Sequence, residues 1–209
     1  MGSSRIEAFS DGMIAIFITI MVLEMKVPHG EDFAALSGVW PVFLSYVMSF
    51  VFLGIYWNNH HHMLQTLEKV TGGILWANLH LMFWLSLVPF ATGWMGENHF
   101  GSVPAALYGV VLLMSAIAYY VLQQTIIYTQ GEGSLLRKAV GTDWKGKLSP
   151  LLYIAGIVVA FWHPIVTLAL YASVAAIWLV PDSRIEERVK KEEEKLEARE
   201  GARERKRKA

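Results

Sequence analysis

Cysteine is absent from this 209-residue chain, and charged residues make up only 17% of it. The missing thiols exclude a disulfide framework, a thiolate metal site and a cysteine nucleophile. Soluble domains carry about 25% charged and about 45–50% apolar residues. This chain has fewer charged residues, is 54% hydrophobic and has a mean hydropathy of +0.38. The composition therefore excludes an ordinary soluble domain and indicates an integral membrane protein.

The few charges are distributed unevenly along the chain. Residues 182–209 hold 11 of the 18 Lys and Arg and 9 of the 18 Asp and Glu, which leaves 7 basic and 9 acidic residues before them. So few charges cannot give residues 1–181 a polar surface. Nucleic-acid binding is disfavoured because no basic face exists outside the mixed-charge tail. We predict a membrane domain over 1–181 and a charged cytoplasmic tail over 182–209.

Six apolar runs are candidates for crossing the hydrocarbon layer, which takes about 20 residues. Helices satisfy their own backbone in lipid, and these runs are too continuous for the alternating strands of a barrel. His163 and Pro164 alone separate the last two runs, which predicts a tight helical hairpin. We predict an all-α protein with six transmembrane helices, over Ile6–Met25, Trp40–Asn59, Gly72–Met95, Pro104–Tyr128, Leu148–Trp162 and Ile165–Val180.

The orientation follows from the positive charges of the short loops. The loop 96–103 has no Lys or Arg, whereas the tail and the loop after the fourth run are rich in them, the loop holding Arg137, Lys138, Lys145 and Lys147. Basic loops stay in the cytoplasm. The prediction is a multi-pass protein of the cell membrane with both termini cytoplasmic.

The first run contains an acidic residue, Asp11, inside an otherwise apolar segment. A charge at the bilayer centre costs on the order of 2.5–3.5 kcal/mol, so the carboxylate should face protein or water and have a partner. The predicted topology places its neighbours in the same leaflet. An indole, an imidazole and an amide are suitable donors, and we predict a polar network that joins the first three helices through Arg5, Ser10, Asp11, Trp57, His60 and Asn78.

A second pattern in the first run is an apolar stripe. At 100° per residue, Ile16 and Leu23 lie within about 20° of each other, and Ile20 and Thr19 flank them. Asp11 lies about 140° from Ile16, so the carboxylate and the stripe face different neighbours. Taken alone, such a stripe on a membrane helix more often serves packing than pore lining.

These residues together resemble a known family. Arg5-x-x-x-Phe9-Ser10-Asp11 is similar to the signature of the endolysosomal potassium channel transmembrane protein 175 and its prokaryotic relatives. Trp57-x-x-His60-His61 and Asn78 with Pro89-Phe90 also fit, although Val88 stands where the family usually has Leu. The resemblance is close over the first three runs and extends over the others by hydropathy only.

The resemblance implies a potassium-permeable cation channel in which the first helix of each of four identical subunits lines a central pore. The positions five, nine and twelve residues after the signature Asp imply an apolar constriction at Ile16, Ile20 and Leu23. Thr19 would offer a hydroxyl to the permeant potassium ion. No Thr-Val-Gly-Tyr-Gly carbonyl filter occurs in the sequence. The expected partners are membrane lipid, monovalent cations and further copies of the chain, with no cofactor beyond the ion.

Other function classes have weaker support in the sequence. No Ser-His-Asp arrangement, His-Glu-x-x-His motif or phosphate loop occurs, so we predict that the chain is not an enzyme. His60, His61 and His62 point in different directions on a helix and do not predict a metal site. A secondary transporter, or a proton-conducting protein that uses the Asp11 and His60 network, is the alternative that stays open.

Overall fold

The computed structural model describes residues 3–131, 134–141 and 143–179, and the described chain is helical. Four helices have the length and apolar character needed to cross a membrane: Ser4–Leu23, Trp40–Gln65, Gly72–Glu97 and Ser102–Gln130. Pro164–Leu179 is apolar but shorter. The prediction of an all-helical membrane-type chain is confirmed. The predicted tail over 182–209 lies outside the described residues.

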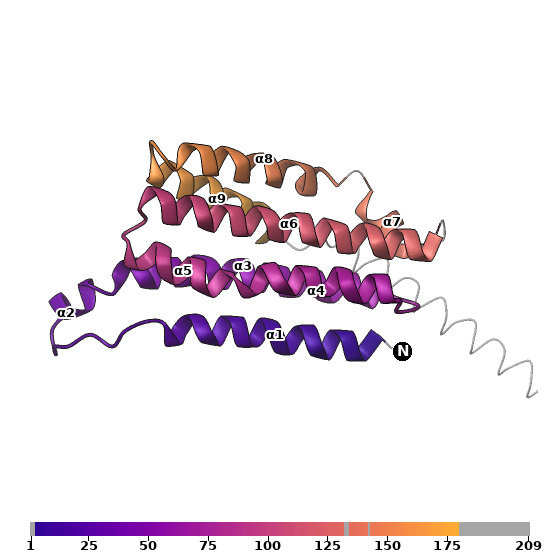
Figure 1. Ribbon diagram of the computed structural model, residues 1–209, viewed down its shortest axis with the longest axis horizontal. Helices are drawn as coiled ribbons and strands as arrows, with labels where there is room; N and C mark the ends of the chain where they lie inside the picture. Colours follow the sequence, from indigo (N-terminus) through magenta and orange to yellow (C-terminus); the bar gives the residue numbers. More distant parts are fainter. Residues whose placement is uncertain (1–2, 132–133, 142, 180–209) are drawn as a thin grey trace, which may run out of the picture.

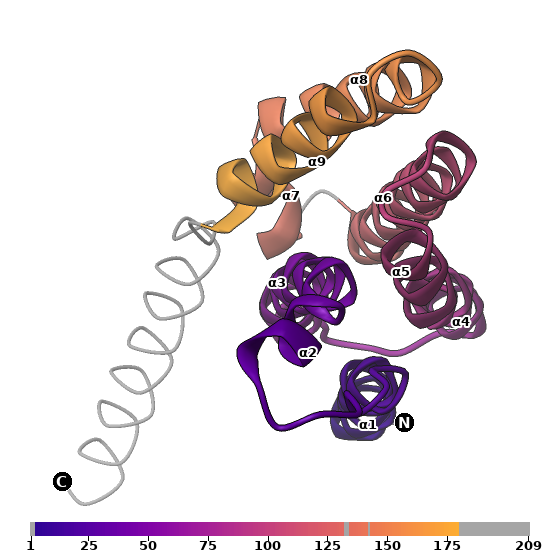
Figure 2. The ribbon, with the colours of Figure 1, turned by 90° about the vertical axis from the view of Figure 1, so that its left-hand side faces the viewer.

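The helices run side by side along the long axis of the molecule (Figure 1). Seen end-on, α1 lies at one edge of the bundle, α3 to α6 occupy its middle, and α8 and α9 lie at the far edge (Figure 2). Their bounds are α1 Ser3–Leu23, α2 Phe33–Ser37, α3 Trp40–Gln65, α4 Gly72–Ser86, α5 Val88–Glu97, α6 Ser102–Gln130, α7 Leu135–Val140, α8 Trp144–Val159 and α9 Pro164–Leu179.

The third predicted helix, Gly72–Met95, is divided into α4 and α5. The break lies at Leu87, two residues before Pro89 at the start of α5. Proline has no amide hydrogen to continue a helix, and its ring crowds the preceding turn. The helical path nevertheless continues, because the amide of Ala91 bonds the carbonyl of Leu87 at 3.0 Å.

The last two predicted helices are shorter than a typical span. Both α8 and α9 have 16 residues, or about 24 Å of helix against a hydrocarbon layer of about 30 Å. The helix α8 also begins four residues earlier than predicted, because the Asp143 carboxylate caps it by accepting from the amide of Gly146 at 3.1 Å. The predicted count of six spans is therefore not reached by length and hydropathy alone.

Two short helices, α2 and α7, were absent from the predicted scheme. Each begins after a capping side chain: Asp32 accepts from the amide of Ala35, and Ser134 accepts from the amide of Arg137. Aspartate and serine are preferred at this position because their oxygens satisfy free amides of the first turn. Both helices lie in connections between the longer ones, and α7 brings basic residues to the end of α6.

The contact between α6, α8 and α9 depends on two glycines that approach one tyrosine. A Cβ atom added at Gly109 or at Gly156 would overlap the ring of Tyr171. That ring is fully buried, and its hydroxyl donates to the carbonyl of Ala105 at 3.2 Å. The absence of side chains at these two positions lets the hairpin α8–α9 pack closely against α6.

Candidate pore helix and its polar anchor

One face of α1 packs against the rest of the chain. Ile6, Ile14, Phe17 and Met21 are all at most 6% exposed, and Ser10 is fully buried. Their spacing of three or four residues places them on one side of the helix. This face contacts α3, α4 and α5, and it attaches α1 to the bundle.

The other face of α1 is uncovered and largely apolar. Ile16 is 54% exposed, Ile20 is 39% exposed and Leu23 is 80% exposed. Phe9, nearer the start of the helix, is 48% exposed. Thr19 is also exposed, and its hydroxyl donates to the carbonyl of Ile16 at 2.9 Å. Within the described part of the subunit the predicted stripe is therefore left exposed, on a helix that lies at one edge of the bundle (Figure 2).

The carboxylate of Asp11 is held by an indole of α3. Trp57 Nε1 donates to Asp11 Oδ1 at 3.0 Å, and the Trp57 ring stacks on His61 with 6.3 Å between ring centroids. Asp11 is half-buried, and Trp57 is 48% exposed. A hydrogen bond to an ionised acceptor is among the stronger ones, so this contact fixes α1 against α3.

A second set of polar side chains joins α1, α3 and α4. His60 Nε2 lies 2.7 Å from Asn78 Oδ1, and Asn78 Nδ2 donates to Ser10 Oγ at 3.0 Å. Ser10 in turn donates to the carbonyl of Ile6 at 2.8 Å. Because an amide oxygen only accepts, His60 carries a proton on Nε2. All three side chains are at most 1% exposed, and Nδ1 of His60 has no hydrogen-bond partner in the described chain.

The single network predicted from the sequence is thus divided into two. The expectation that His60 and Asn78 donate to Asp11 is wrong, because they bond each other and Ser10. Adjacent residues on a helix point about 100° apart, so Ser10 faces α4 while Asp11 faces α3. Arg5 is exposed and forms no ion pair with Asp11 in the described part of the chain.

Metal binding finds no support around the three consecutive histidines. His61 and His62 both lie at hydrogen-bond distance from Gln65, at 3.0 and 3.4 Å. Over residues 3–131, 134–141 and 143–179, no group of three or more His, Cys, Asp or Glu side chains is placed to hold a metal ion.

With this geometry in view, comparison with known proteins gives a consistent result. A family model described as the endosomal/lysosomal potassium channel TMEM175 matches residues 5–89. A potassium channel of Chryseobacterium sp. (strain P1-3) is 53% identical over 190 residues, which cover 91% of this chain and 99% of that relative. The chain belongs to the TMEM175 family.

Two further TMEM175 proteins place the chain within the family. The crystal structure of a lysosomal potassium-selective channel TMEM175 homolog from Chamaesiphon minutus matches with a TM-score of 0.74 and 26% identity, covering 86% of this chain and 97% of that one. The endosomal/lysosomal proton channel TMEM175 of Homo sapiens is 32% identical over 103 residues, or 44% of this chain and 20% of the human protein. The family is one of ion channels, which confirms that the chain is not an enzyme.

The part of the chain that matches the TMEM175 model contains both polar sets described above.

A further set of polar side chains, which the sequence analysis did not predict, joins α3, α5 and α6: Ser49 Oγ lies 2.6 Å from Thr92 Oγ1 and 2.9 Å from the Tyr108 hydroxyl. The only signal for it was the presence of hydroxyl side chains within apolar spans, where such groups bond neighbouring helices.

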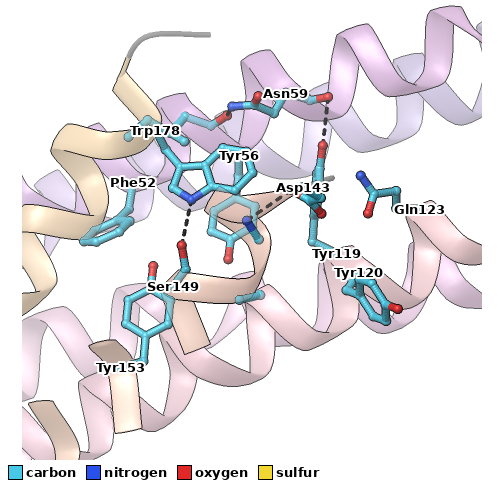
Figure 3. Close-up of a pocket in the computed structure, with 13 residues that line it drawn as sticks. Phe52, Tyr56, Asn59, Tyr119, Tyr120, Gln123, Asp143, Ser149, Tyr153 and Trp178 are labelled. Atoms are coloured by element: carbon cyan, nitrogen blue, oxygen red, sulfur yellow. Dashed lines mark hydrogen bonds between the residues drawn. The ribbon is translucent and has the colours of Figure 1, made fainter. Parts of the chain in front are cut away.

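A small, partly open cavity lies between α3, α6, α8 and α9 (Figure 3). Its volume is about 60 Å³, and its polar lining includes Asn59, Gln123 and Asp143. At one wall Trp178 Nε1 donates to Ser149 Oγ at 2.8 Å. The space is large enough for water and too small for a larger ligand. Its α3 lining lies within the residues that match the TMEM175 model, and its lining from α6, α8 and α9 lies beyond them.

Proposed function

We propose that this chain forms a potassium-permeable cation channel whose pore is lined by α1 from four copies of the chain. The observation that carries the proposal is the stripe of Ile16, Ile20 and Leu23, whose apolar side chains the described helices of the subunit leave exposed. The family membership and the relative named a potassium channel support the ion class.

Pore formation requires assembly. One subunit contributes one α1, and a closed ring of identical faces around an axis follows cyclic symmetry. In a homotetramer, the exposed faces of four α1 helices would meet at the axis, while the buried face of each stays anchored to its own bundle. The hydrogen bonds of Ser10 and Asp11 hold α1 in that rotation. These two sets, Asp11 with Trp57 and Ser10 with Asn78 and His60, form a polar anchor that is structural and does not line the ion path.

The chemistry of the proposed constriction is apolar. Four copies of Ile16 would form a narrow dry segment that resists water, with Ile20 and Leu23 as further layers. Such a segment forces an ion to lose part of its hydration shell. Thr19, between these layers, would supply a hydroxyl oxygen to the passing potassium ion. No cofactor is required.

The proposed topology keeps six membrane crossings. The hairpin of α8 and α9 would supply the last two, with local thinning of the bilayer compensating for their length. An even number of crossings places both termini on one side, and the basic residues Arg137, Lys138 and Lys147 put that side in the cytoplasm of a cell membrane. An impermeant thiol reagent that labels Arg199→Cys in intact cells would contradict this orientation.

The test of the channel proposal is conduction by purified protein in planar bilayers. Under a potassium gradient we expect discrete single openings with a linear current and a reversal potential set by potassium. When sodium replaces potassium on one side, the reversal potential should shift in the direction that shows potassium to be more permeant than sodium. A saturable flux without single openings would instead indicate a transporter.

The role of the stripe is tested by Ile16→Asn. An amide in each subunit should let water enter the constriction, giving larger currents and weaker discrimination between potassium and sodium. Val47→Asn is the matched control, because Val47 is 40% exposed and lies seven residues from the start of α3, as Ile16 lies seven residues from the end of α1. Unchanged conduction in assembled Ile16→Asn protein would place the pore on another helix.

Proton conduction is a second candidate. It is favoured by the buried hydrogen-bonded set of His60, Asn78 and Ser10, in which Nδ1 of His60 has no hydrogen-bond partner among the described residues, and by the human relative's name as a proton channel. With equal potassium on both sides, a reversal potential that follows an imposed pH gradient would support it. The shift should disappear in Asn78→Leu if protons use this hydrogen-bonded set, and persist if they use the central pore.

A further inference from the structure

An open groove of about 500 Å³ lies between α6, α7 and α8, outside the candidate pore and its anchor. Its α6 wall runs from Ala116 to Ile127, which is about 16 Å along the helix. Because α6 is a candidate span that ends at Gln130, the groove extends from the middle of the span to its end. The α7 and α8 walls close only that end.

The closed end of the groove carries an excess of positive charge. Arg137 from α7 and Lys147 from α8 line it, against the single carboxylate of Asp143. That carboxylate already accepts a hydrogen bond from the amide of Gly146, whereas both basic side chains are exposed. A phosphate group would therefore meet two cations at this end.

The open end of the groove is apolar. On α8 the lining residues Asp143, Lys147 and Pro150 share one helical face, which continues to Ile154 and Val158. These two side chains are 48% and 52% exposed. On the α6 side, Ile117 continues the apolar wall and is 39% exposed. The groove thus changes from basic to apolar as it runs toward the middle of the spans.

Aromatic side chains mark the level of the basic end. Trp144 begins α8 and is 53% exposed, and Tyr128, two residues before the end of α6, is 86% exposed. Exposed tryptophan and tyrosine at helix ends collect at the headgroup level of a bilayer. A phosphate bound by Arg137 and Lys147 would therefore lie at the depth where lipid phosphates already are.

We propose that this groove binds an anionic phospholipid, with the headgroup phosphate between Arg137 and Lys147 and an acyl chain along Ile117, Ile154 and Val158. Basic pockets between membrane helices bind anionic headgroups in this way. A lipid fits better than a free phosphate ion, because half of the groove lies at hydrocarbon depth, which a soluble anion does not occupy. The proposal does not depend on where the pore lies.

Binding is tested by lipid retention on the full-length protein purified in detergent. The probes are phosphatidylglycerol and phosphatidylcholine with the same acyl chains, counted by native mass spectrometry. We expect phosphatidylglycerol to be retained selectively, and Arg137→Gln with Lys147→Gln to weaken its binding about thirtyfold, the effect of losing two cations near the membrane surface. Equal retention of the two lipids by the unsubstituted protein would overturn the proposal.

A double variant with the same loss of charge is the control. Lys69→Gln with Lys138→Gln removes two exposed basic residues that do not line the groove, and it should bind phosphatidylglycerol as before. An equal loss in both double variants would mean general attraction to a basic surface and would overturn the site. Full displacement of the lipid by millimolar glycerol phosphate would identify a free phosphate site instead.

The location is tested independently of those variants, which covers the case in which they fail to fold. Because the chain has no cysteine, Gln124→Cys gives a single labelling position in the groove, and Thr129→Cys gives an exposed control on the same helix. A fluorophore at residue 124 should be quenched more by phosphatidylglycerol with a nitroxide on the upper acyl chain than by the matching phosphatidylcholine. Equal quenching by the two lipids, or a residue 124 that another subunit shields from a maleimide, would refute the proposal.

Discussion

Hydrogen bonds between polar side chains join α1, α3 and α4, whereas tyrosine rings packed against glycines fill the contact of α6 with α8 and α9. In the first region Trp57 bonds Asp11, and Asn78 bonds both Ser10 and His60. In the second, the ring of Tyr171 lies 6.0 Å from that of Tyr108 and 6.1 Å from that of Tyr153, measured between centroids.

This difference explains which region is recognisable from sequence. A bond between two side chains needs particular residue types at particular positions, so it leaves a motif such as Phe9-Ser10-Asp11. Close packing of rings against glycine needs only suitable volume and shape, which several residue combinations provide. The family model accordingly matches residues 5–89, and the contact of α6 with α8 and α9 lies outside that match.

The largest expected effect on stability is at the packed glycine of α6. Gly109→Val should destabilise the protein by about 3 kcal/mol, at the upper end of the range for overpacking, because the added atoms overlap the buried ring of Tyr171. The measurement is the melting temperature of detergent-purified protein. Gly93→Ala is the control, since nothing lies within 4 Å of the added Cβ, and a similar loss there would remove the distinction between the regions.

The next effect concerns the buried amide of the first region. Asn78→Ala removes both of its hydrogen bonds and leaves the buried groups of Ser10 and His60 with fewer partners. The expected loss is about 1–2 kcal/mol, measured by thermal unfolding. Asn98→Ala removes an exposed amide that bonds only its own helix, and should change stability little. If the two variants melt alike, the polar anchor does not stabilise α1.

A smaller effect is expected at the partly exposed carboxylate. Trp57→Phe keeps most of the ring and removes the donor to Asp11, which should cost about 0.6 kcal/mol, the average for hydrogen bonds between membrane helices.

Asp11→Asn should lower stability or the yield of assembled protein without changing ion preference. Normal melting combined with lost cation selectivity in Asp11→Asn would show that the carboxylate lines the ion path.

The smallest effect is expected at the opposite end of α1. Lys26 Nζ lies 2.8 Å from Glu97 Oε1, and both side chains are exposed. The hydrogen bond and charge of Glu97 raise the pKa of Lys26 above its ordinary value of 10.5. The pair should therefore contribute at neutral pH and lose its contribution as the pH rises through that raised pKa. Lys26→Gln should leave the melting temperature almost unchanged at pH 7, because exposed pairs are screened by water.

Sequence reasoning reached the architecture of the first region in some detail. Four of the six predicted helices have counterparts of spanning length, and the donor from Trp57 to Asp11 was among the expected contacts. The sequence-based prediction was wrong where the direction of a side chain decides which partner it bonds. Ser10 and Asp11 are neighbours in the chain, but their side chains point to different helices, and only the rotation of α1 against α3 and α4 determines which partner each one meets.

The amino-acid sequence by itself determined that this is a helical membrane protein, because continuous apolar runs and scarce charge leave no other stable solution in water or lipid. It also placed the stripe of Ile16, Ile20 and Leu23 on one face of a helix, because helical periodicity is local. Only the tertiary structure decided that this face is uncovered, that the polar anchor is two sets and not one, and that Arg137 and Lys147 line one groove. Those properties depend on contacts between residues far apart in the chain, which periodicity and composition do not encode.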